Sequence, residues 1–311
     1  IDNFLIDNWN KPFIVAEAGI NHNGNLDNAL KMIKIAKNAG VDAIKFQTFK
    51  AEEFVSDKEQ LFTYTSQGKE ISEPMYDLFQ RCELQEKEWY KIKEECDNLN
   101  IKFLSTPQNF SDLDLLLKLN LSAIKIGSDD LTNLPLLKSY SKTKLPIIIS
   151  CGMSTFEEID DALNTIGYSD GYPIVLLITT SQYPTPSEDV NLRRIETLQK
   201  KFPNLPLGFS DHTIGPLAST LALSFGACFF EKHFTIDHNL QGPDHWFSVN
   251  PHELKEWVDS IHNAYSIMGN PSLVPTKHEQ EMKKLARRSI VTIKDIFPDT
   301  ELTLKYTMYT P

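Results

Sequence analysis

The sequence has few cysteines and no long apolar run. Its four cysteines are spread over 311 residues and form no CxxC pair, so their spacing signals neither a disulfide framework nor a thiolate zinc site. No stretch of about 18 uncharged apolar residues is present, and the first residues have neither the basic end nor the apolar centre of a signal peptide. We therefore expect a cytoplasmic protein without a membrane segment.

Positive charge is also scarce. The 31 lysines and arginines are outnumbered by 42 aspartates and glutamates, which gives a formal net charge of −11. Nucleic acids and anionic membranes bind basic surfaces, so we expect neither as a partner. An anionic small substrate is still compatible with this balance where individual lysines line its site. The hydrophobic content of 41%, with 23% charged residues, is that of an ordinary soluble globular protein.

Short apolar or β-branched runs alternate with amphipathic helical patterns along the chain. The expected strands cover residues 13–17, 42–47, 101–105, 122–127, 145–150, 172–179, 205–210 and 227–232. Helical patterns such as 26–40 and 156–167 lie between them, the first with Gly40 as a stop signal. Eight β-α units most simply close into a (β/α)8 TIM barrel, an α/β fold, with an open doubly wound sheet as the alternative. No GxGxxG follows the first strand, which disfavours a dinucleotide-binding sheet.

Two segments are additional to the eight β-α units of a minimal barrel. Residues 48–83 form an insertion rich in charged and aromatic residues, which we expect to be a loop over the site. The last expected barrel helix covers 251–269. It is followed by a polar stretch and then by RRSIVTIKDIFPDTELTLKYTMYTP, which reads as β structure outside the barrel.

Lysines and hydroxyl residues stand at the carboxyl ends of several expected strands, where barrel enzymes carry their chemistry. Lys45 and Lys125 come from the second and fourth strands. Either lysine alone is explained equally well by an ion pair. Together with the hydroxyl groups at this rim they suit a phosphate, since lysine supplies charge and hydroxyls supply directional donors. These hydroxyl residues are Ser105, Thr106, Ser128 and Ser150.

Two histidines follow neighbouring strands. His212 follows the seventh strand and His233 ends the eighth, so their imidazoles are expected close together and beside Glu17. Each alone reads as a structural histidine. As a pair they predict a metal site, and imidazoles with oxygen ligands suit Mn²⁺, Fe²⁺, Co²⁺ or Zn²⁺ more than Mg²⁺. His22 and His238 are expected in turns without chemistry.

The ordered blocks FIVAEAGINHNG, KFQT, FLSTP, IKIGS, SCGMS, YPTP, GFSDHT, EKHFT and GPDH resemble the sialic acid synthase family over residues 12–297. This family condenses phosphoenolpyruvate with an N-acetylated hexosamine to give nine-carbon 2-keto acids. A single block such as GPDH is a weak signal. Nine blocks in order, spaced as eight barrel strands, are specific.

The resemblance implies a (β/α)8 barrel followed by a small antifreeze-like β domain, in a domain-swapped homodimer. On this basis we expect the barrel in residues 1–285, and a linker with the truncated start of the antifreeze-like domain in 286–311. It also implies a divalent metal held by His212 and His233, with Mn²⁺ the first expectation and Mg²⁺ or Co²⁺ as alternatives.

The resemblance further implies roles for individual residues. Glu17, Lys45 and Lys125 are the expected catalytic residues, with Glu17 near the reacting carbons. Phosphoenolpyruvate is expected against the two lysines and the hydroxyls of Ser128, Ser150, Ser181 and Ser210. The sugar is expected to contact Gln47, Asp130, Tyr183 and Asp244. Relatives often have Gly-Glu after the serine of the Ser128 block and can have asparagine at position 181, so this chain departs from the family at Asp130 and Ser181.

These expectations converge on a synthase of the N-acetylneuraminate or N,N'-diacetyllegionaminate type. Pseudaminic acid synthase is the alternative within the same chemistry, because the motifs do not encode the stereochemistry of the sugar. An enzyme of the 3-deoxy-octulosonate type is less favoured, since YPTP and GPDH follow the sialic pattern. A non-catalytic sugar-binding barrel would have lost the metal or phosphate residues, yet Glu17, Lys45, Lys125, His212 and His233 are all present.

Overall fold

A computed structural model describes residue 1, residues 4–305 and residues 307–310 of the chain. The chain divides into two compact units, Ile1–Met268 and Gly269–Pro311. The eight barrel strands and their carboxyl ends lie in the first unit, which ends at Met268, whereas the barrel domain was predicted to extend to residue 285. Within the described residues, no helix has the length and apolar character needed to cross a membrane.

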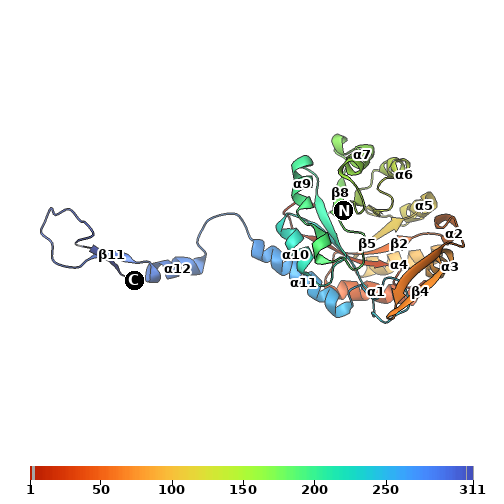
Figure 1. Ribbon diagram of the computed structural model, residues 1–311, viewed down its shortest axis with the longest axis horizontal. Helices are drawn as coiled ribbons and strands as arrows, with labels where there is room; N and C mark the ends of the chain where they lie inside the picture. Colours follow the sequence, from red (N-terminus) through yellow and green to blue (C-terminus); the bar gives the residue numbers. More distant parts are fainter. Residues whose placement is uncertain (2–3, 306, 311) are drawn as a thin grey trace. The chain divides into compact units, whose positions relative to one another are not determined.

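The first unit is a closed barrel of parallel strands, which confirms the predicted (β/α)8 fold and excludes the open sheet. Each predicted strand is present, shifted by a few residues at its ends. The strands lie inside a layer of helices (Figure 1). They are β1 (Phe13–Gly19), β2 (Ala43–Thr48), β5 (Lys102–Pro107), β6 (Ile124–Ile126), β7 (Ile147–Ser150), β8 (Ile174–Ile178), β9 (Leu207–Asp211) and β10 (Phe229–His233).

The three barrel helices predicted at 26–40, 156–167 and 251–269 are present, and each ends one residue earlier than predicted. Gly40 follows α1 in the left-handed conformation at φ 90°, which a residue without a side chain adopts easily. Thr155 caps α7 through a capping box with Glu158. The helices are α1 (Leu26–Ala39), α4 (Glu86–Asn98), α5 (Phe110–Lys118), α6 (Leu134–Ser141), α7 (Phe156–Ile166), the short α8 (Ser187–Val190), α9 (Arg194–Lys201), α10 (Leu217–Ser224) and α11 (Pro251–Met268), with a 3₁₀ turn η1 (Tyr168–Asp170).

The barrel interior changes character along the strands. Outward positions stay apolar and pack against the helices, which hides the alternation that a half-buried strand shows in sequence. Inward positions are apolar at the amino ends and polar at the carboxyl ends. On β1, Phe13 and Val15 belong to the apolar interior cluster, and Glu17 follows two residues later. On β10, Phe229 is followed by Glu231 in the same way. The barrel interior is thus apolar at the amino ends of the strands and polar at their carboxyl ends.

The insertion after β2 is a folded substructure, so the prediction of a loop over residues 48–83 was wrong. It consists of α2 (Ala51–Phe54), an antiparallel hairpin of β3 (Leu61–Ser66) and β4 (Lys69–Pro74), and α3 (Met75–Cys82). It has its own apolar cluster, which includes Phe49, Tyr64 and Leu78. Its aromatic residues fill this cluster, and the Gln67-Gly68 turn supplies the positive φ angles that the hairpin requires.

The hairpin reaches the segment that follows β10. Gln67 Nε2 donates a hydrogen bond to the carbonyl oxygen of Asn239 at 2.7 Å, and the Gly242 amide donates to Ser66 Oγ at 3.2 Å. The insertion therefore supports the segment that carries Asp244.

The second unit contains α12 (Lys277–Ala286) and an antiparallel pair, β11 (Ser289–Thr292) and β12 (Thr307–Thr310). Thr276 caps α12 through a capping box with Glu279. The β structure predicted outside the barrel is thus present. The start of an antifreeze-like domain in 286–311 stays a prediction, and its residues 306 and 311 lie outside the described part of the chain.

Asp112 gives the first unit a specific pH dependence. The side chain is buried in the first turn of α5, where it accepts the Asn109 amide in a capping box. Burial raises the pKa of its carboxyl group to about 7. Because the folded pKa exceeds the unfolded one, the native state holds the proton more tightly between these values. We expect the free energy of unfolding to fall as pH rises from about 4 to 7, by at most about 1.4 kcal/mol per pH unit.

The comparison that measures this effect is denaturant unfolding of the wild type and Asp112→Asn across that range. Asparagine keeps an acceptor for the Asn109 amide and does not titrate. The free energy of unfolding of the wild type minus that of Asp112→Asn should therefore fall as pH rises from about 4 to about 7, the pKa of Asp112 in the folded protein. A difference that is flat throughout this range would contradict the assignment.

Candidate active site

Four buried charged side chains form a continuous chain across the rim. Lys45 Nζ lies 2.7 Å from Glu17 Oε2 and 3.6 Å from Glu231 Oε1. Lys125 Nζ lies 3.7 Å from the same Glu231 oxygen. The other Glu231 oxygen, Oε2, is buried without a hydrogen-bond partner among the described residues. One buried carboxylate thus holds two buried ammonium groups.

The proton affinities follow from burial and from these pairs. Burial raises the pKa of Glu17, an effect that the Lys45 ammonium group only partly offsets. Burial also opposes ionisation of Glu231, but Lys125 and Lys45 outweigh it and lower the pKa of Glu231. For Lys45, the ion pairs overcome burial and raise the pKa, whereas burial prevails at Lys125 and lowers it. Of these two carboxyl groups, Glu231 is the one whose ionised form its lysine partners favour, whereas burial favours the neutral form of Glu17.

Small polar groups beside Lys125 form a cradle for an anion. Lys125 Nζ donates to Ser150 Oγ at 2.8 Å. The Gly152 amide donates to Ser128 Oγ at 2.9 Å. A Cβ atom on Gly152 would lie 2.4 Å from Ser181 Oγ and 2.8 Å from Ser128 Oγ, so only glycine leaves this space open. The structure therefore brings together three of the hydroxyl groups predicted to bind phosphate.

The two predicted metal ligands lie side by side. The ring centroids of His212 and His233 are 5.6 Å apart. Burial lowers the pKa of His212 to about 4 and that of His233 well below its usual value, so both imidazoles are neutral near pH 7, as metal ligands must be. His233 Nδ1 is buried without a hydrogen-bond partner in the described chain, with Asp244 Oδ2 at 3.9 Å.

The donor set around this pair fits a divalent cation that takes its remaining ligands from substrate or water. Nowhere among residues 1, 4–305 and 307–310 are three or more histidine, cysteine, aspartate or glutamate side chains grouped to hold a metal. Two neutral imidazoles with an orphaned buried nitrogen still suit Mn²⁺ or a similar ion, because catalytic metals keep positions open.

The hydrogen bonds of His212 fix its tautomer. Its Nδ1 lies 2.7 Å from the carbonyl oxygen of Thr180, which can only accept, so Nδ1 carries the proton. Its Nε2 lies 3.4 Å from Ser210 Oγ and has the lone pair. A hydrogen bond of this kind on the far nitrogen orients a histidine for metal binding.

Aromatic rings enclose the histidine pair. The Tyr183 ring centroid lies 4.1 Å from that of His212 and 5.6 Å from that of His233. Phe247 packs on both His233 and Tyr183, at 5.5 Å and 5.1 Å. Asp244 comes from the same segment as Phe247, and burial raises the pKa of its carboxyl group to about 7. These side chains form a half-buried wall suited to a polar ligand with an apolar face.

The remaining predicted residues differ in placement. Gln47 Nε2 lies 3.4 Å from Glu17 Oε1, beside the buried ion pairs. Asp130 instead accepts a hydrogen bond from Asn133, the N-cap of α6, at 3.1 Å. Its neighbour Asp129 is exposed and contributes to the field at Lys125. A sugar contact of Asp130 therefore stays a prediction, since the hydrogen bond that its carboxyl group accepts comes from the N-cap of α6.

The chain matches a model of the NeuB family over residues 32–272. The chain belongs to this family. N,N'-diacetyllegionaminic acid synthases of Legionella pneumophila and Campylobacter jejuni are each 40% identical to it, covering 94% and 95% of this chain and 83% and 90% of their own. The crystal structure of an N-acetylneuraminic acid synthetase from Leptospira borgpetersenii superposes with a TM-score of 0.81 at 35% identity, covering 92% of this chain and 94% of that one.

These findings confirm the predicted resemblance, since sialic acid synthases and NeuB relatives are one family. The chain is accordingly an enzyme of the synthase type. Its relatives identify no individual residue of the site, so the roles given to the side chains above depend on the geometry.

Sequence reasoning missed two residues of this NeuB site. The position of Glu231 could have been predicted from the sequence. It stands two positions before His233 on one strand, and side chains two apart on a strand point to the same side, here the barrel interior. The position of Phe247 could not, since it lies in an irregular segment whose course depends on distant contacts. Asn21 Nδ2 donates to the carbonyl oxygen of Phe234 at 2.9 Å and to Ser248 Oγ at 3.0 Å, which holds that segment against the loop after β1.

His245 supports the same segment through both of its ring nitrogens. Its Nδ1 lies 2.6 Å from Thr235 Oγ1, and its Nε2 lies 3.3 Å from Asn23 Oδ1. His22 accepts the Gly24 amide at 3.1 Å, which confirms its place in a turn. His238 lies 3.1 Å from Glu253 Oε2, away from the histidine pair.

Proposed function

We propose that this NeuB enzyme condenses phosphoenolpyruvate with an N-acetylated mannosamine-type hexosamine. The product is a nine-carbon 2-keto acid of the sialic type, released with phosphate. The observation that supports this proposal is a group of buried cationic and polar side chains next to a pair of histidines. The group consists of Lys45, Lys125 and the Ser128–Gly152 cradle, and the pair is His212 and His233. The first group suits a small anion with phosphate and carboxylate groups, and the second suits the carbonyl end of a sugar.

In this reaction, C3 of phosphoenolpyruvate forms a bond to the aldehyde carbon of the open-chain sugar, and the aldehyde oxygen takes up a proton. Water then adds to C2 and loses a proton. The C–O bond between C2 and the phosphate then breaks, and the C2 hydroxyl group gives its proton to the departing phosphate, which leaves a ketone at C2. Atoms balance as phosphoenolpyruvate, sugar and water giving keto acid and phosphate.

The side chains divide these tasks. Lys45 and Lys125 hold the negative groups of phosphoenolpyruvate, and Glu231 keeps the two ammonium groups in place. Glu17 accepts the proton of the attacking water, for which a carboxyl group whose pKa is raised by burial is suited. His212 and His233 would hold the divalent cation, which supplies Lewis-acid polarisation of a carbonyl oxygen. Tyr183 and Asp244 line the side where the sugar enters.

The sugar proposed first is 2,4-diacetamido-2,4,6-trideoxymannose, with N-acetylmannosamine as the second test substrate. Support comes from the two diacetyllegionaminic acid synthases at 40% identity, against 36% for a pseudaminic acid synthase of Campylobacter jejuni. Pseudaminic acid synthesis is the alternative within the same reaction. Mn²⁺ as the physiological ion and the domain-swapped homodimer stay predictions from the resemblance.

The direct test is phosphate release from phosphoenolpyruvate with a panel of these sugars, with and without Mn²⁺. We expect release only when a sugar is present, and stimulation by Mn²⁺. The panel includes the pseudaminic acid precursor, so the preferred sugar separates the two syntheses. No release with any hexosamine would refute the synthase proposal.

Replacing Gly152 by alanine tests the anion cradle. The new methyl group would lie 2.4 Å from Ser181 Oγ and 2.8 Å from Ser128 Oγ. We expect KM for phosphoenolpyruvate to rise about 10-fold to 100-fold, which corresponds to one lost hydrogen bond to a charged group. The KM for the sugar should change little. Steady-state kinetics with each substrate varied measures both, and an unchanged KM for phosphoenolpyruvate would place that substrate elsewhere.

A further inference from the structure

Arg194 lies outside the barrel at the start of α9 and holds the loop that follows β8. Its Nη2 donates to the carbonyl oxygen of Val190 at 2.9 Å and to Thr180 Oγ1 at 3.0 Å. The same nitrogen lies 3.5 Å from the carbonyl oxygen of Thr179, and Nε lies 3.4 Å from that of Asn191. One guanidinium group therefore ties the beginning of this loop to its end.

Thr180 connects this arginine to the histidine pair. Its side chain accepts from Arg194, and its carbonyl oxygen accepts from His212 Nδ1 at 2.7 Å. A second hydrogen bond joins this loop to His212. The Thr185 amide donates to the carbonyl oxygen of His212 at 2.9 Å. The loop between Thr180 and Thr185 also contains Ser181 and Tyr183.

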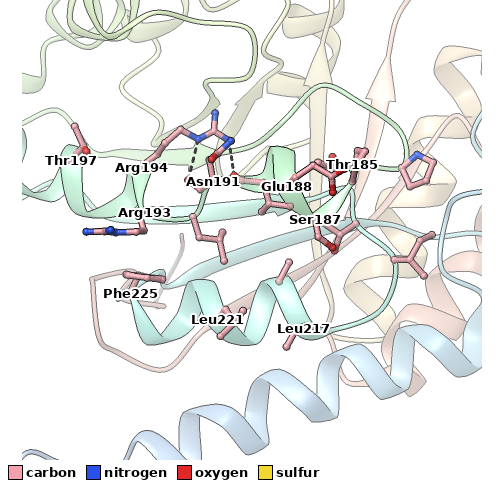
Figure 2. A pocket seen from close by; sticks show the side chains of 17 residues that line it. Thr185, Ser187, Glu188, Asn191, Arg193, Arg194, Thr197, Leu217, Leu221 and Phe225 are labelled. Carbon is pink, nitrogen blue, oxygen red and sulfur yellow. Dashed lines mark hydrogen bonds between the residues drawn. The ribbon is translucent and has the colours of Figure 1, made fainter.

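The arginine is reached from a groove on the outer face of the barrel. Figure 2 shows this groove between the segment that carries Arg193 and Arg194 and the side chains of Leu217, Leu221 and Phe225 on and beside α10. Its volume is about 950 Å³. The two arginines point in different directions, and Arg193, which directly precedes α9, pairs with Glu196 of α9 at 2.9 Å. Arg194 is thus bound to the loop, whereas Arg193, next to it in sequence, is bound to the surface of α9.

We propose that Arg194 is a positioning residue for His212: by holding Thr180, it keeps the imidazole in the Nδ1–H tautomer with Nε2 directed toward the site. Arg194 does not contact the histidine pair and acts only through the loop. The proposal rests on the proposed function for its effect on turnover. The tautomer and the affinity for a metal ion are measured without substrate, so the two can fail separately.

The test compares Arg194→Met with Arg194→Lys and with the matched control Arg193→Met. Methionine keeps the length of the side chain and removes every donor, whereas lysine restores part of the donor set. Long-range ¹H–¹⁵N NMR reports the tautomer of His212, with its signals assigned by comparison with His212→Gln. Electron paramagnetic resonance with Mn²⁺ alone reports the affinity, and circular dichroism reports folding.

For Arg194→Met we expect loss of the pure Nδ1–H pattern and a fall in Mn²⁺ affinity of about 10-fold, as for other groups that orient a metal ligand. Arg194→Lys should recover part of both, and Arg193→Met should match the wild type. A folded Arg194→Met protein with the wild-type tautomer and affinity overturns the proposal.

Two further outcomes are also decisive. If Arg194→Met does not fold, Thr180→Val replaces it, because valine lacks the side-chain oxygen that accepts from Arg194 and keeps the backbone carbonyl group. A folded Thr180→Val protein with the wild-type tautomer and affinity then overturns the proposal. If the wild type shows no synthase turnover while Arg194→Met still changes the tautomer, the positioning role stands and the proposed function fails.

Discussion

Replacement of His233 by alanine is expected to abolish Mn²⁺-dependent phosphate release, with turnover reduced by about 10³-fold. A metal bound at a developing charge contributes several kcal/mol to the transition state, and about 4 kcal/mol corresponds to that factor. His233 ends β10 with Nδ1 buried and unpartnered among the described atoms, next to His212. Activity at a series of Mn²⁺ concentrations, together with Mn²⁺ binding by the free enzyme, measures the effect.

The barrel should stay folded in this variant, because His233 stands at the open end of its strand and makes no hydrogen bond through Nδ1 with the described residues. His238→Ala is the matched control. It removes a histidine of the same segment that lies 3.1 Å from Glu253, so its Mn²⁺ response should equal that of the wild type. Unchanged Mn²⁺ dependence in His233→Ala would refute the ligand assignment.

The fold was predictable because barrel strands and helices have local signals. The stop at Gly40 depends on neighbouring residues only and is where the sequence predicts it, and the capping box at Thr155 is local in the same way. The insertion was mispredicted because the pattern of residues 61–74 was read as charge and aromatic content. Its alternation across the Gln67-Gly68 turn is a hairpin signal.

The site was predictable to the extent that strand ends determine it. Parallel strands bring their carboxyl ends to one rim, so Glu17, Lys45 and His233 meet there whatever their separation in sequence. Contacts made by loops were not predictable. Phe247 reaches His233 only because Asn21 and the β3–β4 hairpin hold its segment, and no local pattern encodes those contacts.

The buried charges at the rim allow stability and catalysis to be separated. Lys125→Met leaves Glu231 with Lys45 alone, which Glu17 shares. Breaking a buried pair from one side is expected to lower the free energy of unfolding by about 3 kcal/mol. The same change removes a charge that we propose holds phosphoenolpyruvate, so kcat/KM for this substrate should fall by about 10²-fold to 10³-fold.

Adding Glu231→Leu to Lys125→Met should restore most of the lost stability, because the double variant has no unpaired carboxylate and keeps the Glu17–Lys45 pair at 2.7 Å. Activity should stay lost, since neither replacement can hold an anion. Denaturant unfolding of the wild type, both single variants and the double variant gives the interaction free energy.

Lys232→Met is the control for the loss of a buried lysine outside the site. Lys232 is equally buried but faces away from the site, where it pairs with Asp211 at 3.2 Å. We expect it to lower stability without raising the KM for phosphoenolpyruvate. A Lys125→Met enzyme whose KM for phosphoenolpyruvate matches that of Lys232→Met would show that Lys125 acts in folding alone, and the anion would then have to be bound by Lys45 and the hydroxyl cradle without it.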